Sequence, residues 1–340
     1  MKPFSVFSLQ HAEDLSQVAS FKHSRFLAGG TNLVDLMKHQ IERPDHIIDL
    51  SGFDEANQIT EDDGRVVIGA MVTNTALADY AYKHPRLSLL AQALLAGATV
   101  QLRNRASTAG NLLQRTRCYY FYDTSKACNK REPGSGCAAK EGFNRIHAIL
   151  GTSEHCIATH PSDMATAMVA LDARVHICNA AGVRRELPVR ELYTLPGDTP
   201  HVETQLADDD LITAVSIDTV PRGTHIYQKV RDRSSYAFAL VSVACTLRVN
   251  EGVIDEVSLA LGGVAPRPWH AHQAEACLLG NPPSPELFAQ AAEAELKDAR
   301  SYGGNDYKVP VLRRTLTHVL NQASDHQRAH PSHEGAMYAR

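Results

Sequence analysis

The chain has 340 residues, of which 44% are apolar and 21% are charged, as in an ordinary globular protein. This length exceeds the size at which a single core usually keeps growing, so we expect two or three domains. Its 34 basic and 38 acidic residues give no positive field that would gather nucleic acid. No apolar stretch approaches the roughly 20 residues of a membrane span, so we expect neither nucleic-acid binding nor a span.

The first 55 residues predict a small α/β unit in which strands and helices alternate. The expected elements are strands at 4–7, 25–28 and 46–50, a helix over 13–19, and a helix that starts at Leu33 and is ended by Pro44. A second unit, residues 56–220, contains a strand at 65–69, an Ala/Leu-rich helix over 87–96 and a strand at 174–178. Within it, Ser162 is a suitable N-cap for a helix whose apolar residues recur at helical spacing.

A third unit, residues 221–323, follows a polar run at 207–210 and Pro221-Arg222-Gly223. It predicts strands at 226–230, 239–249 and 257–261, and a helical end over 285–320 that breaks near Gly303-Gly304. From Ser324 the sequence has no apolar period. We therefore expect residues 324–340 to form a disordered tail.

Residues 28–33, with the sequence AGGTNL, lie between a predicted strand and a predicted helix. Free backbone N–H groups and the helix dipole favour a bound phosphate at such a place, and glycine lets the backbone approach it. The loop lacks the GxGxxG and GK[ST] patterns, so it equally fits an ordinary turn with Thr31 or Asn32 as N-cap. A second segment, RNRASTAGNL at 103–112, favours binding, because the two loops could hold a dinucleotide from both sides.

Four of the seven cysteines, Cys118, Cys128, Cys137 and Cys156, lie close together in a stretch rich in glycine. Four thiolates suit zinc or an iron–sulfur cluster. The stretch has no CxxC pair, which disfavours structural zinc, and two disulfides or four unrelated thiols are further alternatives. The other three cysteines are expected to be small buried hydrophobes.

The two glycine loops resemble those of the FAD-binding medium subunits of xanthine dehydrogenase-like molybdenum hydroxylases, which read A-G-G-T-N-L and T-x-G-G-N. The resemblance extends from Phe4 to about Leu320, and residues 114–118 and 129–131 resemble the flavin subunits of bacterial periplasmic aldehyde oxidoreductases. It implies an α+β fold: a two-part FAD-binding domain of the vanillyl-alcohol-oxidase (PCMH) type, then an antiparallel sheet with helices like the C-terminal domain of the CO dehydrogenase flavoprotein.

By this resemblance, the first loop would wrap the pyrophosphate, the second would bind it from the facing side, Asp163 would hold the ribityl or ring portion, and Lys229 would lie by the isoalloxazine. The residues implied to bind FAD are Phe26, Leu27, Ala28, Gly29, Gly30, Thr31, Asn32, Leu33, Ser107, Gly110, Asn111, Asp163 and Lys229. Ala109 stands where the family has a glycine. Without the resemblance, Asp163 would be read as a first-turn acidic residue and Lys229 as a solvated charge.

Some members of the family carry an inserted loop that binds a [4Fe–4S] cluster, which implies that the four cysteines are its ligands in a loop over residues 113–160. We expect His147, His155 and His160 to lie on the surface or behind the thiols, because four thiolates complete the ligand set of such a cluster. No acid, base or nucleophile constellation suggests substrate chemistry in this chain.

The resemblance further implies a heterotrimer with a molybdenum-cofactor large subunit and a [2Fe–2S] small subunit. This chain would pass electrons from the partner clusters through FAD to an acceptor. The alternatives are the flavin subunit of an NAD-dependent xanthine or aromatic dehydrogenase, and a stand-alone flavoprotein oxidase. The start, MKPFSVF, has no secretion signal, so we expect export to the periplasm with a signal-bearing partner, or alternatively a cytoplasmic location.

Overall fold

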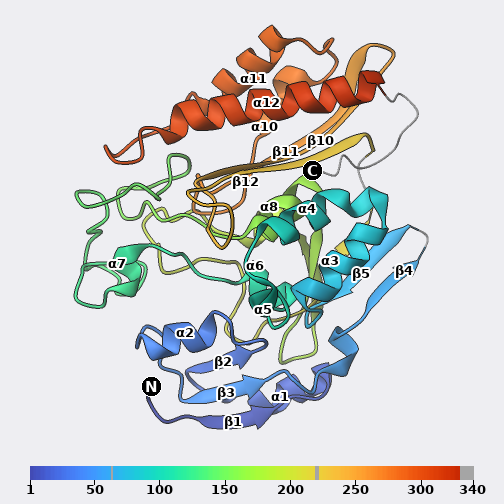
Figure 1. Ribbon diagram of the computed structural model, residues 1–340. Helices are drawn as coiled ribbons and strands as arrows, with labels where there is room; N and C mark the ends of the chain where they lie inside the picture. The colour runs from blue at the N-terminus through green and yellow to red at the C-terminus, as the bar shows by residue number, and fades with distance from the viewer. Residues whose placement is uncertain (63, 219–221, 330–340) are drawn as a thin grey trace.

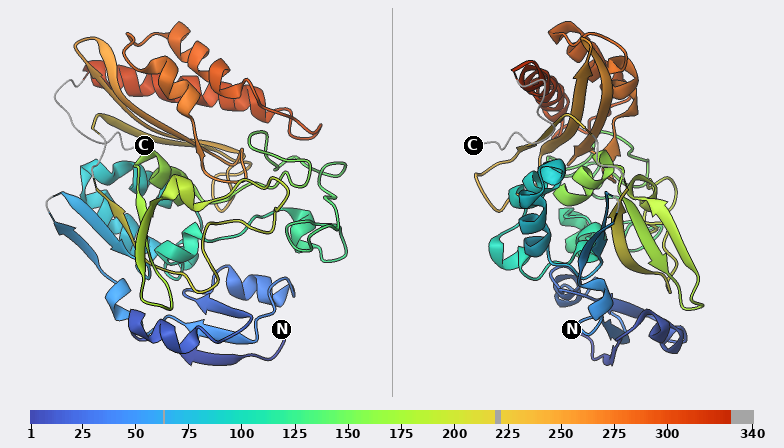
Figure 2. Two further views of the ribbon diagram at one scale, coloured as in Figure 1. Left: turned by 180° about the vertical axis from the view of Figure 1, so that it is seen from behind. Right: turned by 90° about the vertical axis from the view of Figure 1, so that its right-hand side faces the viewer.

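The computed structural model describes residues 1–62, 64–218 and 222–329. These residues form three units, each built round its own sheet, and the expected α+β fold is confirmed (Figure 1). Figure 2 shows the N-terminal and C-terminal units at opposite ends of the molecule with the second unit between them.

The N-terminal unit has a parallel sheet in the order β1-β3-β2. Its elements are β1 (Ser5–Ser8), a 3-10 turn (Ala12–Asp14), α1 (Leu15–Val18), β2 (Ser24–Leu27), α2 (Leu33–Lys38) and β3 (His46–Asp49). Strand β3, which was predicted at 46–50, holds Ile47 and Ile48, each 1% exposed, at its centre. Helix α2 ends before the predicted stop at Pro44, because Gln40 adopts a φ of 59°.

The second unit has an antiparallel sheet in the order β4-β5-β8-β6-β7. Its strands are β4 (Ile59–Asp62), β5 (Arg65–Gly69), β6 (Arg174–Cys178), β7 (Arg184–Pro188) and β8 (Leu211–Ile217). The strands predicted at 65–69 and 174–178 are confirmed. Strand β8 was not predicted, although it lies at the centre of the sheet, between β5 and β6.

Short helices surround this sheet and share one core with it. They are two 3-10 turns (Asp54–Ala56 and Pro85–Leu87), α3 (Asn74–Lys83), α4 (Ser88–Ala96), α5 (Val100–Arg103), α6 (Thr108–Leu112), α8 (Asp163–Ala170) and α9 (Val189–Leu192). The predicted cap is confirmed, since the Ser162 side chain accepts a hydrogen bond from the N–H of Ala165 at the start of α8. Every residue of α8 is buried, which fixes this helix firmly between the second and third units.

The third unit is an antiparallel sheet in the order β12-β11-β10-β9. Its elements are β9 (Thr224–Val230), β10 (Val241–Asn250), β11 (Val253–Gly262), β12 (Trp269–His270), α10 (His272–Leu278), α11 (Pro285–Leu296) and α12 (Lys308–Ala329). Helices α10 to α12 cover the outer face of the sheet (Figure 1), while α4 and α8 pack on the inner face. The predicted break in the helical end is confirmed, with Gly303 at a φ of 95°.

The prediction of a disordered tail from Ser324 is wrong for residues 324–329, which continue α12. Ser324 and Gln327 are buried there, and the Gln327 side-chain amide donates a hydrogen bond to the Thr224 hydroxyl of β9 at 3.1 Å. Tertiary contact therefore extends a helix whose sequence has no apolar period. Residues 330–340, and residues 219–221 at the predicted boundary between the second and third units, lie outside the described part of the chain.

The cysteine loop, residues 113–160, has one short helix, α7 (Tyr119–Tyr122), and little other regular structure. It projects beside the N-terminal unit (Figure 1). A small core of its own includes Phe121 and Ile157, both fully buried, packed with the thiols and with Leu36 of α2.

Candidate functional site

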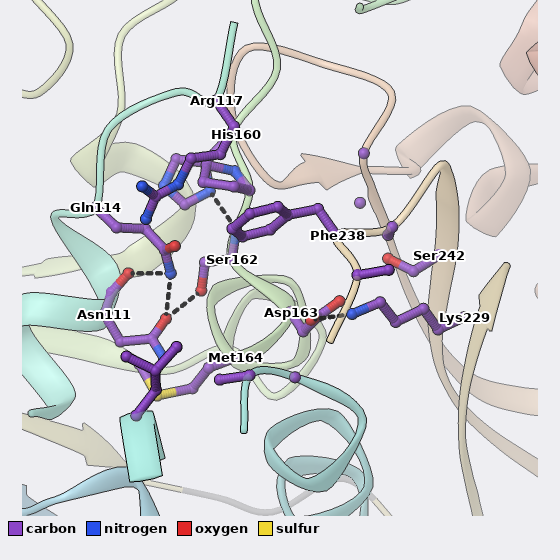
Figure 3. Close-up of a pocket in the computed structure, with 18 of the residues that line it drawn as sticks. Asn111, Gln114, Arg117, His160, Ser162, Asp163, Met164, Lys229, Phe238 and Ser242 are labelled. Carbon is purple, nitrogen blue, oxygen red and sulfur yellow. Dashed lines mark hydrogen bonds and ion pairs between the residues drawn. The ribbon is translucent and has the colours of Figure 1, made fainter. Parts of the chain in front are cut away.

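A cavity of about 800 Å³ lies where the three units meet. Figure 3 shows polar side chains from the second unit, the cysteine loop and the third unit pointing into it. Clefts of this size are typical of small-molecule and cofactor sites. The cavity is therefore the candidate cofactor site.

Six of the residues predicted to bind FAD line this cavity: Thr31, Asn32, Gly110, Asn111, Asp163 and Lys229. The remaining seven are not among the lining residues: Phe26, Leu27, Ala28, Gly29, Gly30, Leu33 and Ser107. Their direct contact with the cofactor stays a prediction. The structure does bring both glycine loops and the distant Asp163 and Lys229 to one place.

The two glycine loops touch each other through backbone. A Cβ added at Gly29 would lie 1.6 Å from the carbonyl oxygen of Arg105 in the second loop, so only glycine fits there. Gly30 has a φ of 74°, which favours glycine. The two loops therefore lie against each other, and this contact requires glycine at position 29.

The second loop ends in a hydrogen-bonded group round Asn111. Its side-chain amide donates to Asn74 Oδ1 at 2.7 Å, and its Oδ1 accepts from Ser162 Oγ at 2.6 Å and from Gln114 Nε2 at 2.8 Å. Ser107 caps α6 by accepting a hydrogen bond from the N–H of Gly110 at 3.2 Å. These bonds fix the wall on this side of the cavity.

A buried ion pair joins the start of α8 to β9. Lys229 Nζ lies 2.7 Å from Asp163 Oδ2, with 4% of the lysine side chain and 9% of the aspartate side chain exposed. The Tyr227 hydroxyl donates to Asp163 Oδ1 at 2.6 Å, and burial, followed by this carboxylate, raises the pKa of Tyr227 well above its usual value. Both residues are thus held in the wall. Asp163 lies in the first turn of α8, as its local sequence suggests, but Lys229 is not the solvated charge that its local sequence suggests.

Three buried polar atoms in the wall have no hydrogen-bond partner among the described residues: Asn32 Nδ2, Arg117 Nε and Ser242 Oγ. Arg117 Nη1 donates to the Tyr122 hydroxyl at 2.7 Å, but Arg117 Nε is buried without a hydrogen bond among the described residues. Buried donors are normally paired. The wall therefore offers an unsatisfied donor to a ligand that carries acceptors, which fits a phosphate-containing cofactor.

Several segments of the wall were missed by the sequence analysis, among them the turn after β9 and part of the cysteine loop. The turn between β9 and β10 contributes Arg233, Tyr236 and Phe238, and no motif marks it. The cysteine loop contributes Arg117 and His160, and Arg117 could have been found because it directly precedes Cys118. His160, expected on the surface or behind the thiols, lies in the cavity wall, where burial lowers its pKa to about 4.

The four clustered cysteines line a second, small cavity of about 10 Å³, and none of the chain's seven cysteines is in a disulfide. Burial raises the pKa of Cys118 to about 12 and that of Cys156 to about 11. His147 Nε2 lies 3.1 Å from Cys118 Sγ, behind the thiols as expected. In the parts of the chain that the structure describes, no three His, Cys, Asp or Glu side chains are close enough to hold a metal ion.

A buried charge network ties the cysteine loop to the rest of the molecule. Lys130 Nζ donates to Glu203 Oε1 at 2.7 Å, and Arg115 pairs with both Glu203 and Glu42. Burial alone would raise the pKa of Glu203, but Lys130 and Arg115 together lower it below the usual range. The loop is therefore anchored to Glu42 of the N-terminal unit and to Glu203 in a later part of the second unit.

Among residues 1–62, 64–218 and 222–329, no helix is long and apolar enough to cross a membrane.

Two family models match the chain. "FAD binding domain in molybdopterin dehydrogenase" matches residues 3–219, and "CO dehydrogenase flavoprotein C-terminal domain" matches residues 225–323. The aldehyde oxidoreductase FAD-binding subunit PaoB of Escherichia coli K12 is 50% identical over 301 residues, which are 88% of this chain and 91% of that protein. The glyceraldehyde dehydrogenase medium chain of Sulfolobus acidocaldarius is 24% identical over 92% of this chain and 95% of its own.

Solved structures show the same fold. A chain of the carbon monoxide dehydrogenase from Hydrogenophaga pseudoflava superposes with a TM-score of 0.73 at 24% identity, over 96% of this chain and 99% of that one. A chain of quinoline 2-oxidoreductase from Pseudomonas putida 86 gives a TM-score of 0.72 at 23% identity, with the same coverage.

Proposed function

Because this chain belongs to the FAD-binding medium subunits of the molybdenum hydroxylase family, we propose that it is the FAD- and [4Fe–4S]-containing electron-transfer subunit of a heterotrimeric molybdenum aldehyde oxidoreductase. The observation that carries the proposal is that four cysteines line one cavity in a loop that also forms part of the FAD cavity wall. The 50% identity to an aldehyde oxidoreductase subunit supports the substrate class.

FAD, when bound, supplies the redox chemistry of the subunit, since it accepts electrons and passes them on. The chain's own residues hold and orient it. Thr31 and Asn32 offer polar groups from the first loop, Gly110 and Asn111 from the second, and the Asp163–Lys229 pair adds a fixed dipole between them. Since Asp163 and Lys229 neutralise each other, this pair positions the cofactor and supplies no free acid or base.

The four thiols fit an iron–sulfur cluster by their chemistry, because such clusters are held by cysteine thiolates. The cavity between them has room for about one water molecule. The loop would therefore widen round a cluster. A structural zinc site is disfavoured, because such sites usually take ligands from close CxxC-type pairs and the stretch has none.

In the proposed complex, a molybdenum-cofactor large subunit oxidises the aldehyde, and a small subunit with [2Fe–2S] clusters delivers the electrons to this chain. This chain would pass them to an external acceptor, with bound FAD supplying the redox chemistry. We further propose that the chain reaches the periplasm together with a signal-bearing partner. Fractionation of cells that express the whole complex tests this: a cytoplasmic pool alone contradicts it.

The test of the cofactor content is iron, acid-labile sulfide and flavin analysis of the full chain prepared anaerobically, with low-temperature EPR after reduction. The proposal expects about four irons and about one FAD per chain, with a cluster signal. Stoichiometric zinc, or FAD without iron, contradicts the cluster and leaves the flavin assignment intact. A colourless protein contradicts both.

A further inference from the structure

We propose that Arg117 binds the pyrophosphate of FAD, and that the cysteine loop holds this arginine in the FAD cavity. The inference rests on the proposed function and deepens it, because it makes the loop with the four cysteines a part of the flavin site. Neither glycine motif contains Arg117.

The cysteine loop forms one wall of the FAD cavity. Its lining residues are Gln114, Arg117, Tyr119, Ile146, Thr159 and His160.

Five of these six residues lie within four positions of Cys118 or Cys156 in the sequence. Arg117 and Tyr119 flank Cys118 directly, and Thr159 and His160 follow shortly after Cys156. Ile146 precedes His147, whose ring nitrogen lies 3.1 Å from Cys118 Sγ. The position of this wall is therefore set by the same short segments that position the thiols.

Among the described residues, four cationic side chains line the cavity: Arg103, Arg117, Arg233 and Lys229. Lys229 is neutralised by Asp163 at 2.7 Å. Arg103 and Arg233 donate to backbone carbonyl oxygens of their own segments. Arg117 alone of the four has a buried guanidinium nitrogen that lacks a hydrogen bond.

The surroundings of Arg117 hold its guanidinium in place without neutralising it. The Tyr122 hydroxyl accepts one hydrogen bond from it at 2.7 Å, and the guanidinium lies over the ring of Phe238, 5.1 Å from the centroid. The nearest carboxylate, on Asp35, is 3.9 Å away and 45% exposed. A pair at that distance and exposure is weak.

The chemistry of FAD identifies the group that this arginine would bind. At neutral pH the only anionic groups of FAD are its pyrophosphate oxygens, and arginine binds phosphate oxygens with a planar fork of N–H donors. A poorly compensated cation in the cavity wall therefore has one complementary partner on this cofactor. Because Arg117 is bonded to Cys118 through the backbone, loss of a cluster ligand at Cys118 should displace it.

The test is the dissociation constant of FAD, measured by fluorescence quenching on deflavinated full chain at low and at high salt. Arg117→Gln should weaken FAD binding by about tenfold to a hundredfold and reduce the salt dependence of binding. Arg117→Lys, which keeps the charge, should recover part of the affinity. Lys126→Gln removes an exposed cation from the same loop, outside the cavity wall, and should leave both quantities unchanged.

Cys118→Ser should lose iron and show the same weakened, less salt-dependent FAD binding, whereas Cys277→Ser should show neither effect. Arg117→Gln leaves all four thiols in place, so the binding claim is tested even where Cys118→Ser fails to fold. Wild-type affinity in Arg117→Gln overturns the proposal. The proposal is also overturned if Arg117→Gln loses affinity for FAD while the salt dependence stays unchanged and Arg117→Lys restores none of the affinity. That pattern would mean that Arg117 acts through packing and not through its charge. Wild-type protein that binds no FAD at all overturns the proposed function instead.

Discussion

Replacing Lys229 by methionine tests the ion pair at the centre of the site. Methionine keeps the length of the side chain but removes the ammonium group, which lies 2.7 Å from Asp163 Oδ2 and donates to the carbonyl of Ala96 at 3.2 Å. Asp163 then keeps only the Tyr227 hydroxyl as a close partner, while it remains buried.

Removing one partner of a buried pair leaves an uncompensated charge, and this costs about 3–5 kcal/mol of the free energy of unfolding. That loss is a large part of the roughly 5–15 kcal/mol that stabilises a typical domain. Lys229→Met/Asp163→Asn removes both charges and keeps an acceptor for the Tyr227 hydroxyl. We expect the double variant to lose less stability than Lys229→Met alone.

Urea unfolding, followed by the fluorescence of Trp269, measures these differences. Trp269 is the only tryptophan and lies in the same sheet as Lys229, so its signal reports on the unit that carries the pair. The measurements compare deflavinated proteins, because bound FAD would add its own stabilisation. A loss below about 1 kcal/mol in Lys229→Met, the range of an exposed pair, or a double variant that loses the sum of the two single losses, would refute the reasoning.

Three further predictions concern the loop contact, the thiols and a buried lysine. Gly29→Ala places a Cβ 1.6 Å from the carbonyl oxygen of Arg105, so the two glycine loops must separate. The purified variant should therefore lose most of its flavin. Full flavin content after desalting would show that the loop contact is not required. Cys128→Ala should lower iron content and protease resistance of the loop, whereas Cys277→Ala should change neither, and equal iron in both variants would exclude Cys128 as a ligand. Burial lowers the pKa of Lys308 to about 7, which is below the pKa of a lysine in the unfolded chain. At a pH between the folded and unfolded pKa values, the unfolded chain therefore binds more protons than the folded chain. The free energy of unfolding then rises with pH by about 1.4 kcal/mol per pH unit. Urea unfolding at neutral and alkaline pH should therefore favour wild type over Lys308→Met increasingly as pH rises; a pH-independent difference would contradict the shift.

Local sequence patterns were sufficient to predict the elements whose burial or capping is visible within one short segment. Strands β5 and β6 and the start of α8 have buried faces or caps that short segments of sequence reveal. Strand β8 was missed because an acidic run precedes it and because its two partners, β5 and β6, lie far away in the chain. The end of α12 was missed because its sequence is polar, and its hydrogen bond to Thr224 depends on the tertiary structure.

The residues of the site likewise divide into those visible in the local sequence and those that only the tertiary structure brings together. The glycines of the first loop and the four clustered cysteines stand out in the sequence, since glycine and thiol chemistry depend on few neighbours. In their own segments Asp163 looks like an ordinary first-turn acidic residue and Lys229 like a solvated charge. Only the family resemblance selected them as FAD-binding residues from the sequence. Arg117 and Phe238 could not be paired from the sequence, because their contact depends on how the cysteine loop packs against the turn after β9.

The measurement that tests the relay role most directly is the anaerobic absorbance spectrum of the full chain, free of molybdenum, first with an aldehyde and then with dithionite. We predict that the aldehyde leaves the flavin bands unchanged, because Asp163 and Lys229 in the described wall are bound to each other in an ion pair and are not free to act as acid and base. Dithionite should bleach the bands, and an artificial acceptor should restore them. Bleaching by the aldehyde alone would contradict the account and identify an independent oxidase.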